Sequence, residues 1–128
     1  MLMKKLLVLP ILFFSISCFA DVYTGTFQLT NRSVVLKYSF DASNKNNLKG
    51  TLEAFRSNRM TPCWQGVRSI DGSKIDGVDV VLIAAPTSAQ EAMSCEVFQF
   101  EGKAEGNKFI GKFTFGQNVS DVVLTKEK

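Results

Sequence analysis

The sequence predicts a small all-β protein, an antiparallel up-and-down β-barrel of about eight strands. Apolar and polar residues alternate with a period of two along most of residues 21–128, turn-forming stretches separate the alternating runs, and a single short segment has helical character. Strands with one apolar face cannot bury it under helices that the chain lacks, so the sheet must close or fold over on itself. A two-sheet β-sandwich is the alternative. Eight strands enclose either a filled core or room for one small ligand.

The first 20 residues have the layout of a secretory signal peptide. Lys4 and Lys5 precede the apolar run 6–14, and small residues stand at the minus-3 and minus-1 positions before Asp21. The apolar run is too short to span a bilayer of roughly 30 Å. We therefore expect cleavage after Ala20 and a single exported domain over residues 21–128, in the periplasm or outside the cell. The alternative is a lipoprotein acylated, and so membrane-anchored, at Cys18.

Either processing event leaves two cysteines in the folded domain, Cys63 and Cys95. An even pair in an oxidising compartment predicts a disulfide. Closing the loop between these positions stabilises the fold by about 3.5 to 4 kcal/mol in the chain-entropy model.

The first three strands are predicted over residues 22–30, 33–41 and 48–54, each with one apolar face. The short link Asn31-Arg32 favours a hairpin between the first two. A polar loop over residues 41–47 precedes the third.

The fourth run, residues 63–70, is less regular, because Arg68 falls on the same face as Trp64 and Ile70. Residues 71–73, Asp-Gly-Ser, predict a turn into the next strand.

The fifth strand is predicted over residues 78–85 and stops at Pro86. Ser88 and Glu91 have the spacing of a capping box and predict one or two helical turns.

The C-terminal third is the most regular part of the chain. Phenylalanines alternate along two strands joined by a tight turn at Gly106-Asn107, and a last strand over residues 120–126 closes the sheet. We expect Phe100, Phe113 and Phe115 to be core residues. Four glycines on inward faces suit the sharp coiling that closure requires; they are Gly25, Gly50, Gly102 and Gly111.

In strand number and size the chain is similar to avidin-type and lipocalin-type barrels and to the periplasmic barrels that inhibit lysozyme. The sequence signatures of those families are not found in it, so the likeness assigns no residue a role.

Composition argues against catalysis. The chain has no histidine, which removes the commonest general base and the commonest zinc ligand. Its carboxylates fall at outward positions or in turns, where they are expected to be solvated. No cofactor or metal is expected. Without Lys4 and Lys5, 13 basic residues face 12 acidic ones, a net charge of +1, which gives no electrostatic footprint for nucleic acid.

One loop gathers the residue types that dominate protein-binding hot spots, and a disulfide would hold it still. The candidate binding residues are Arg56, Arg59, Met60 and Trp64. The alternative is that Trp64 plugs one end of the barrel and the arginines are solvated.

The inward aromatic residues could line a cavity for a lipophilic ligand, but such a set more often forms the core. We expect no odd polar residue among the inward positions to orient a ligand, which favours a filled core. The sequence therefore predicts an exported, non-catalytic barrel that binds another macromolecule, as an inhibitor, immunity or adaptor protein. A carrier of a small hydrophobic ligand is the alternative.

Overall fold

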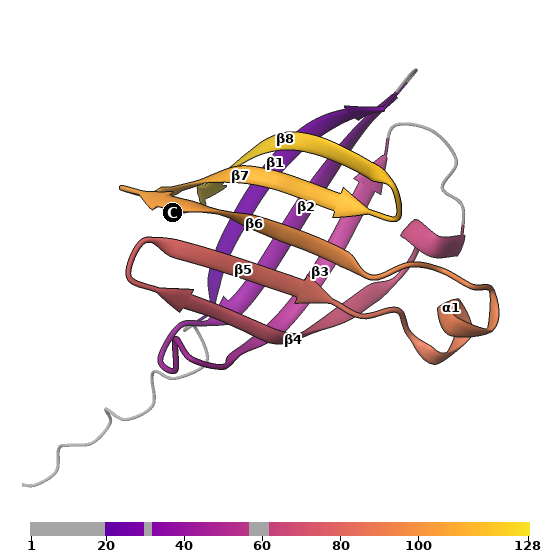
Figure 1. Cartoon of the computed structure of the whole chain (residues 1–128), viewed down its shortest axis with the longest axis horizontal. Coiled ribbons are helices and arrows are strands. Elements are labelled where there is room, and N and C mark those ends of the chain that lie inside the picture. Colours follow the sequence, from indigo (N-terminus) through magenta and orange to yellow (C-terminus); the bar gives the residue numbers. More distant parts are fainter. Residues whose placement is uncertain (1–19, 30–31, 57–61) are drawn as a thin grey trace, which may run out of the picture.

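The structure is a computed structural model that describes residues 20–29, 32–56 and 62–128, with only the backbone of Arg32 and Arg56 (Figure 1). The elements in chain order are β1 (Asp21–Leu29), β2 (Arg32–Asp41), β3 (Leu48–Arg56), the 3₁₀ helix η2 (Pro62–Trp64), β4 (Val67–Asp76), β5 (Asp79–Ala84), α1 (Ser88–Ala92), β6 (Phe98–Glu105), β7 (Lys108–Phe115) and β8 (Asn118–Lys126). Each strand pairs antiparallel with the next, and β8 pairs with β1. The predicted up-and-down barrel is confirmed, and the sandwich alternative is wrong.

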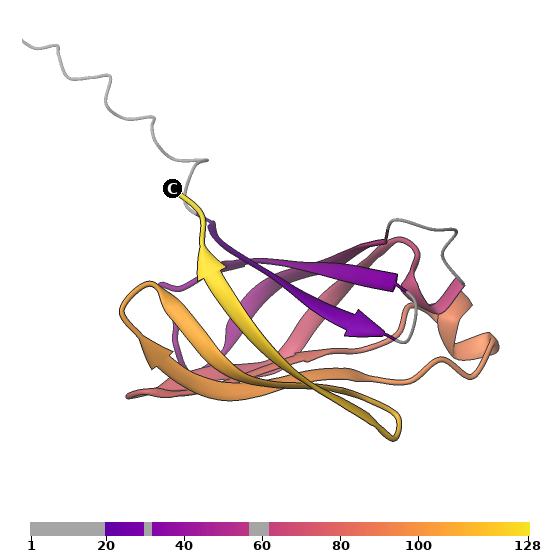
Figure 2. The same cartoon turned by 90° about the horizontal axis from the view of Figure 1, so that it is seen from above.

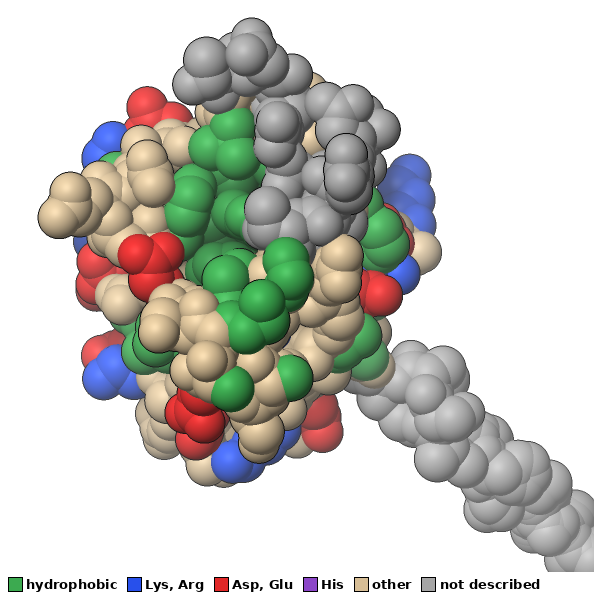
Figure 3. All heavy atoms as spheres, turned by 90° about the vertical axis from the view of Figure 1, so that its right-hand side faces the viewer, with side chains coloured by type: hydrophobic (Ala, Val, Ile, Leu, Met, Phe, Trp, Pro, Cys, Tyr) green, Lys and Arg blue, Asp and Glu red, His purple; other side chains and the backbone are tan. Residues whose placement is uncertain are grey.

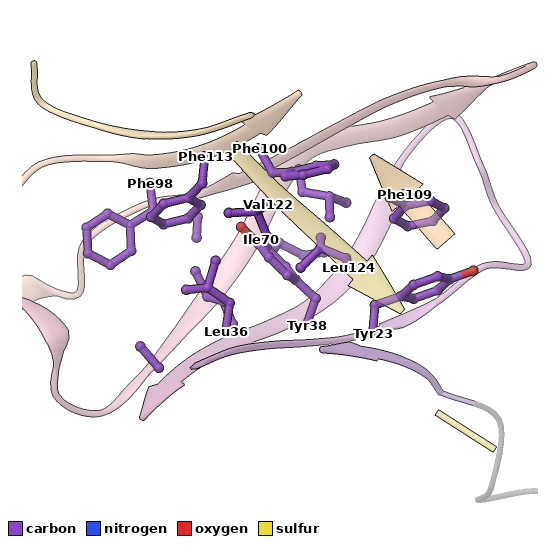
Figure 4. Close-up of a cluster of buried hydrophobic side chains, with 14 of the residues drawn as sticks. Tyr23, Leu36, Tyr38, Ile70, Phe98, Phe100, Phe109, Phe113, Val122 and Leu124 are labelled. Carbon is purple, nitrogen blue, oxygen red and sulfur yellow. The ribbon is translucent and has the colours of Figure 1, made fainter. Parts of the chain in front are cut away.

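The barrel is flattened into two facing walls. Strands β1 to β3 lie in one wall and cross the strands of the other wall at a steep angle (Figure 1). Aromatic side chains from the two walls meet in the interior (Figure 4). The Tyr23 ring of β1 stacks on the Phe109 ring of β7 with centroids 4.0 Å apart. Phe100, Phe113 and Phe115 are buried, which confirms the predicted face of the C-terminal hairpin.

The inward glycines lie where backbones approach too closely for a side chain, as their pattern predicts. A Cβ on Gly111 would lie 2.1 Å from the carbonyl oxygen of Glu101 in β6. A Cβ on Gly25 would lie 2.4 Å from the carbonyl oxygen of Val123 in β8. These positions let the sheet bend sharply enough to close.

The turn predicted at residues 71–73 is wrong, because β4 runs through them and turns into β5 at residues 77–78. The pairing of β4 shifts here by one residue on both sides, which forms a bulge with Gly72 at φ 68°. The buried Ser73 hydroxyl accepts a hydrogen bond from the Ile83 N–H at 2.8 Å. A side chain thus satisfies a backbone donor at the bulge.

Two predicted boundaries also shift. Cys63 and Trp64 belong to η2, and β4 begins only at Val67. Helix α1 is capped by Thr87 and Gln90, one position before the predicted pair. In the part of the chain that the structure describes, no helix is long and apolar enough to cross a membrane.

The chain ends at the same end of the barrel at which it enters β1. The Glu127 N–H donates to the Val22 carbonyl at 2.7 Å, and the Lys126 ammonium lies 3.5 Å from the Asp21 carboxylate. From this point β1 and β8 diverge toward the opposite end (Figure 2).

Candidate binding site at the disulfide end

The end of the barrel opposite the termini is held by a disulfide. Cys63 of η2 is bonded to Cys95, with an S–S distance of 2.07 Å and Cα atoms 5.4 Å apart. The predicted disulfide is confirmed. We call the surface formed by residues 62–67, 85–97 and 115–119 the disulfide end.

Gln90 of α1 forms a second link between the two bonded segments. Its side-chain amide lies within 2.8 to 3.4 Å of three backbone carbonyls of the η2 segment, those of Pro62, Cys63 and Gln65. Its side-chain oxygen accepts a hydrogen bond from the Thr87 N–H at 2.9 Å. One buried residue therefore caps α1 and fastens it to η2.

Arg68 of β4 forms the third link, from inside the barrel. It is 2% exposed, and its guanidinium donates to the carbonyls of Glu96 at 2.7 Å, Cys63 at 3.0 Å and Ala84 at 3.3 Å. The guanidinium carbon lies 3.6 Å from the centre of the Phe98 ring, a cation–π contact. Burial lowers the pKa of Arg68. Among the described residues, no carboxylate forms a salt bridge with it.

Trp64 is 8% exposed and closes this end of the barrel from within. Its ring centre lies 4.6 Å from that of Phe98 and 5.0 Å from that of Phe115. The expectation that Trp64 is an exposed binding anchor is therefore wrong, and the alternative, a plug, is confirmed. Packing against the aromatic rings beneath it buries the indole of Trp64, which is more favourable than exposing it to water.

The other three candidate residues are not brought together by the described structure. Arg56 ends β3, and its backbone alone is described. Arg59 and Met60 lie outside the described residues, so their role remains a prediction.

Apolar side chains that the sequence analysis did not select are exposed at the disulfide end. Met93 is 56% exposed, Val97 46% and Val119 57%. Figure 3 shows hydrophobic side chains lining a hollow on the face of the molecule that contains this end. Met93 and Val97 flank Cys95 in the sequence, and that proximity to a predicted disulfide was the available signal.

A second exposed apolar group lies on the outer wall next to this end. Val35 of β2 is paired directly with Phe55 of β3, and both are exposed. Val67 is also exposed, and its partner Glu53 is two residues from Phe55, which places Val67 diagonally across from Phe55 on the same face. The three side chains extend the apolar surface from the end onto the wall.

The barrel interior is less uniformly apolar than the sequence analysis supposed. Besides Arg68, the Tyr38 hydroxyl is buried, and it has no hydrogen-bond partner in the described structure. Burial raises the pKa of Tyr38 above its ordinary value. Tyr38 is an inward aromatic residue whose hydroxyl could orient a ligand.

The described residues contain no group of three acidic or cysteine side chains placed to hold a metal ion. Comparison of the chain with protein-family models, with curated proteins and with solved structures found no match.

Proposed function

We propose that this protein is an exported, non-catalytic β-barrel that binds another protein through its disulfide end. The observation that carries the proposal is the set of exposed apolar side chains on a backbone fixed by Cys63–Cys95, Gln90 and Arg68. Fixed apolar groups lose little conformational entropy on docking, so more of their contact energy is left for affinity. Exposed apolar patches of this kind are typical of protein interaction sites.

The proposed route to this function is export with removal of residues 1–20. In support, strand β1 begins at Asp21, directly after the predicted cleavage site. Mass spectrometry of the mature chain should find Asp21 as the first residue. A first residue of Cys18 carrying acyl groups would show the lipoprotein instead.

Replacing Val97 with aspartate is expected to weaken partner binding at least about tenfold, because the new charge must be desolvated at the interface. The partner is first captured from envelope extract and identified, and its affinity for each variant is then measured by titration calorimetry. Val78→Asp is the matched control, since Val78 is similarly exposed but lies in the β4–β5 turn, away from the disulfide end. Equal effects of the two substitutions would contradict the proposal.

Arg59→Ala tests the neighbouring loop in the same titration. It is expected to weaken binding by more than about 1 kcal/mol and to leave the melting temperature nearly unchanged. Unchanged affinity would remove Arg59 from the binding surface.

The second candidate function, a carrier of a small hydrophobic ligand, rests on the unpartnered Tyr38 hydroxyl. Rings from opposite walls contact each other across the interior, as Phe27 and Phe113 do at 5.2 Å between centroids, and this favours a filled core. We expect Tyr38→Phe to be neutral or to raise the free energy of unfolding by about 1 kcal/mol, because it removes an unsatisfied buried group. Chemical denaturation measures this. If Tyr38→Phe is clearly less stable than the wild type, and the difference disappears once the wild-type protein has been delipidated, the carrier function is favoured.

A further inference from the structure

The barrel is closed by its shortest ladder. β1 and β8 pair at only two positions, Tyr23 with Lys126 and Thr24 with Thr125, whereas β1 and β2 pair along the full length of β1. The two strands remain close at Gly25, where a Cβ would lie 2.4 Å from the Val123 carbonyl oxygen, and then diverge toward the disulfide end (Figure 2). We call the unpaired strand edges formed by residues 26–29 of β1 and 118–122 of β8 the seam.

The backbone groups that face the seam follow from the pairs that do form. The Val22 carbonyl and Thr24 face β8, and consecutive residues of a strand direct their backbone groups to opposite neighbours. Thr26 and Gln28 therefore present their N–H and C=O groups to the seam. By the same alternation from Thr125, the β8 residues that do so are Val119 and Asp121, whereas the Val123 carbonyl lies against Gly25 of β1.

Proteins ordinarily protect a free strand edge with prolines, lysines or a bulge, because it can pair with another chain. Residues 118–124 contain no proline and no lysine, and residues 26–29 contain no charged residue. The single charge on the β8 edge, Asp121, is paired with Lys112 of β7. A groove of about 430 Å³ adjoins the seam and is lined by Thr26, Ile110, Gly111, Lys112, Asp121, Val122 and Val123.

We propose that the seam binds an extended, uncharged segment of a partner protein, which pairs as an additional strand along β8. Only an extended polypeptide offers donors and acceptors in the alternation that this edge presents. The segment is uncharged because the side chains at the seam are neutral or already paired. A second copy of the chain fits less well, since antiparallel pairing of two β8 edges centred on Asp121 would oppose two carboxylates. The inference rests on the proposed function and assigns part of the partner contact to the seam.

The test uses a blocked peptide of alternating valine and threonine, flanked by lysines for solubility, titrated into ¹⁵N-labelled protein. We expect chemical-shift changes of the backbone amides of Thr26, Gln28, Val119 and Asp121. We also expect nuclear Overhauser contacts between amide protons of the peptide and of β8. The control peptide has the same sequence with every second residue N-methylated, which removes the donors on one edge. Binding of both peptides alike, or shift changes confined to Met93 and Val97, would overturn the proposal.

Val119→Pro provides the matched protein variant. The Val119 N–H faces the seam, so proline there should leave the β7–β8 ladder and the melting temperature nearly unchanged. We expect at least about tenfold weaker peptide binding. Unchanged peptide binding by a folded Val119→Pro variant would overturn the proposal, as would a dimer of the free protein that this substitution dissociates, because a second copy would then occupy the seam.

Measuring the affinity of the natural partner for the variants distinguishes failure of the seam proposal from failure of the proposed function. If Val97→Asp weakens partner binding and Val119→Pro does not, the disulfide end binds the partner and the seam proposal fails. If Val97→Asp acts no differently from Val78→Asp, the proposed function fails, whatever the peptide shows.

Discussion

Replacing Arg68 with methionine is expected to lower the free energy of unfolding by about 3 to 5 kcal/mol. Methionine has a similar length and is apolar, so the loss comes from the carbonyls of Ala84, Glu96 and Cys63, whose bonds to the guanidinium are buried or partly buried. The Cys63 carbonyl retains the Gln90 amide at 3.4 Å. Each buried acceptor left without a donor costs about 1 to 3 kcal/mol, and removing the desolvated charge offsets part of the sum. Urea unfolding at fixed pH measures the change.

Arg68→Lys serves as the control because it retains a positive charge but cannot reach several carbonyls with a planar fork of donors. We expect it to be destabilised as well, though less than Arg68→Met. A methionine variant as stable as the wild type would mean that the guanidinium is not what fastens this end, and that desolvation cancels its hydrogen bonds.

Phe113→Ala is expected to cost about 3 to 5 kcal/mol in the free energy of unfolding, through lost apolar burial and the cavity it leaves. Phe113 is fully buried, and its ring centre lies 5.2 Å from that of Phe27 and 5.5 Å from that of Phe98. It thus joins the two walls of the barrel. For a domain whose total stability is about 5 to 15 kcal/mol, the variant should be studied at low temperature.

Ile110→Ala is the control within the same strand, because Ile110 points outward and is substantially exposed. We expect it to change the free energy of unfolding by less than about 1 kcal/mol. Comparable losses in the two variants would indicate that β7 presents the other face to the core.

The C-terminal hairpin could be predicted from sequence because its signal is local. Alternating phenylalanines fix the inward face, and the turn at Gly106 fixes the register; Phe98 is indeed paired with Phe115 and Phe100 with Phe113. The same reasoning failed at residues 71–73, where Asp-Gly-Ser has the composition of a turn. There the strand continues through a bulge, since the Ser73 hydroxyl replaces a missing backbone partner, a long-range contact that composition does not encode.

Arg68 and Trp64 show why the site was harder to predict than the fold. Arg68 shares a face with apolar residues, which is normally evidence against a strand. Its burial depends on backbone carbonyls supplied by η2, β5 and the segment before β6, and no sequence pattern announces such acceptors. Trp64 precedes β4 in η2, so the parity of a strand does not apply to it, and its ring contacts Phe98 and Phe115 at the barrel end. The exposed residues Met93 and Val97 follow no periodicity; their position beside Cys95 is a local signal, but their exposure depends on the fold.

The hydrogen bond between Glu127 and Val22 also determines how the protein can be handled. Both ends of the folded chain emerge side by side, at the pole of the barrel farthest from the disulfide end (Figures 1 and 2). A tag or tether on either end therefore leaves the disulfide end facing outward. Because the ends adjoin, a short linker could join them while new ends are opened at the Gly106 turn, which would give a circular permutant with the same barrel.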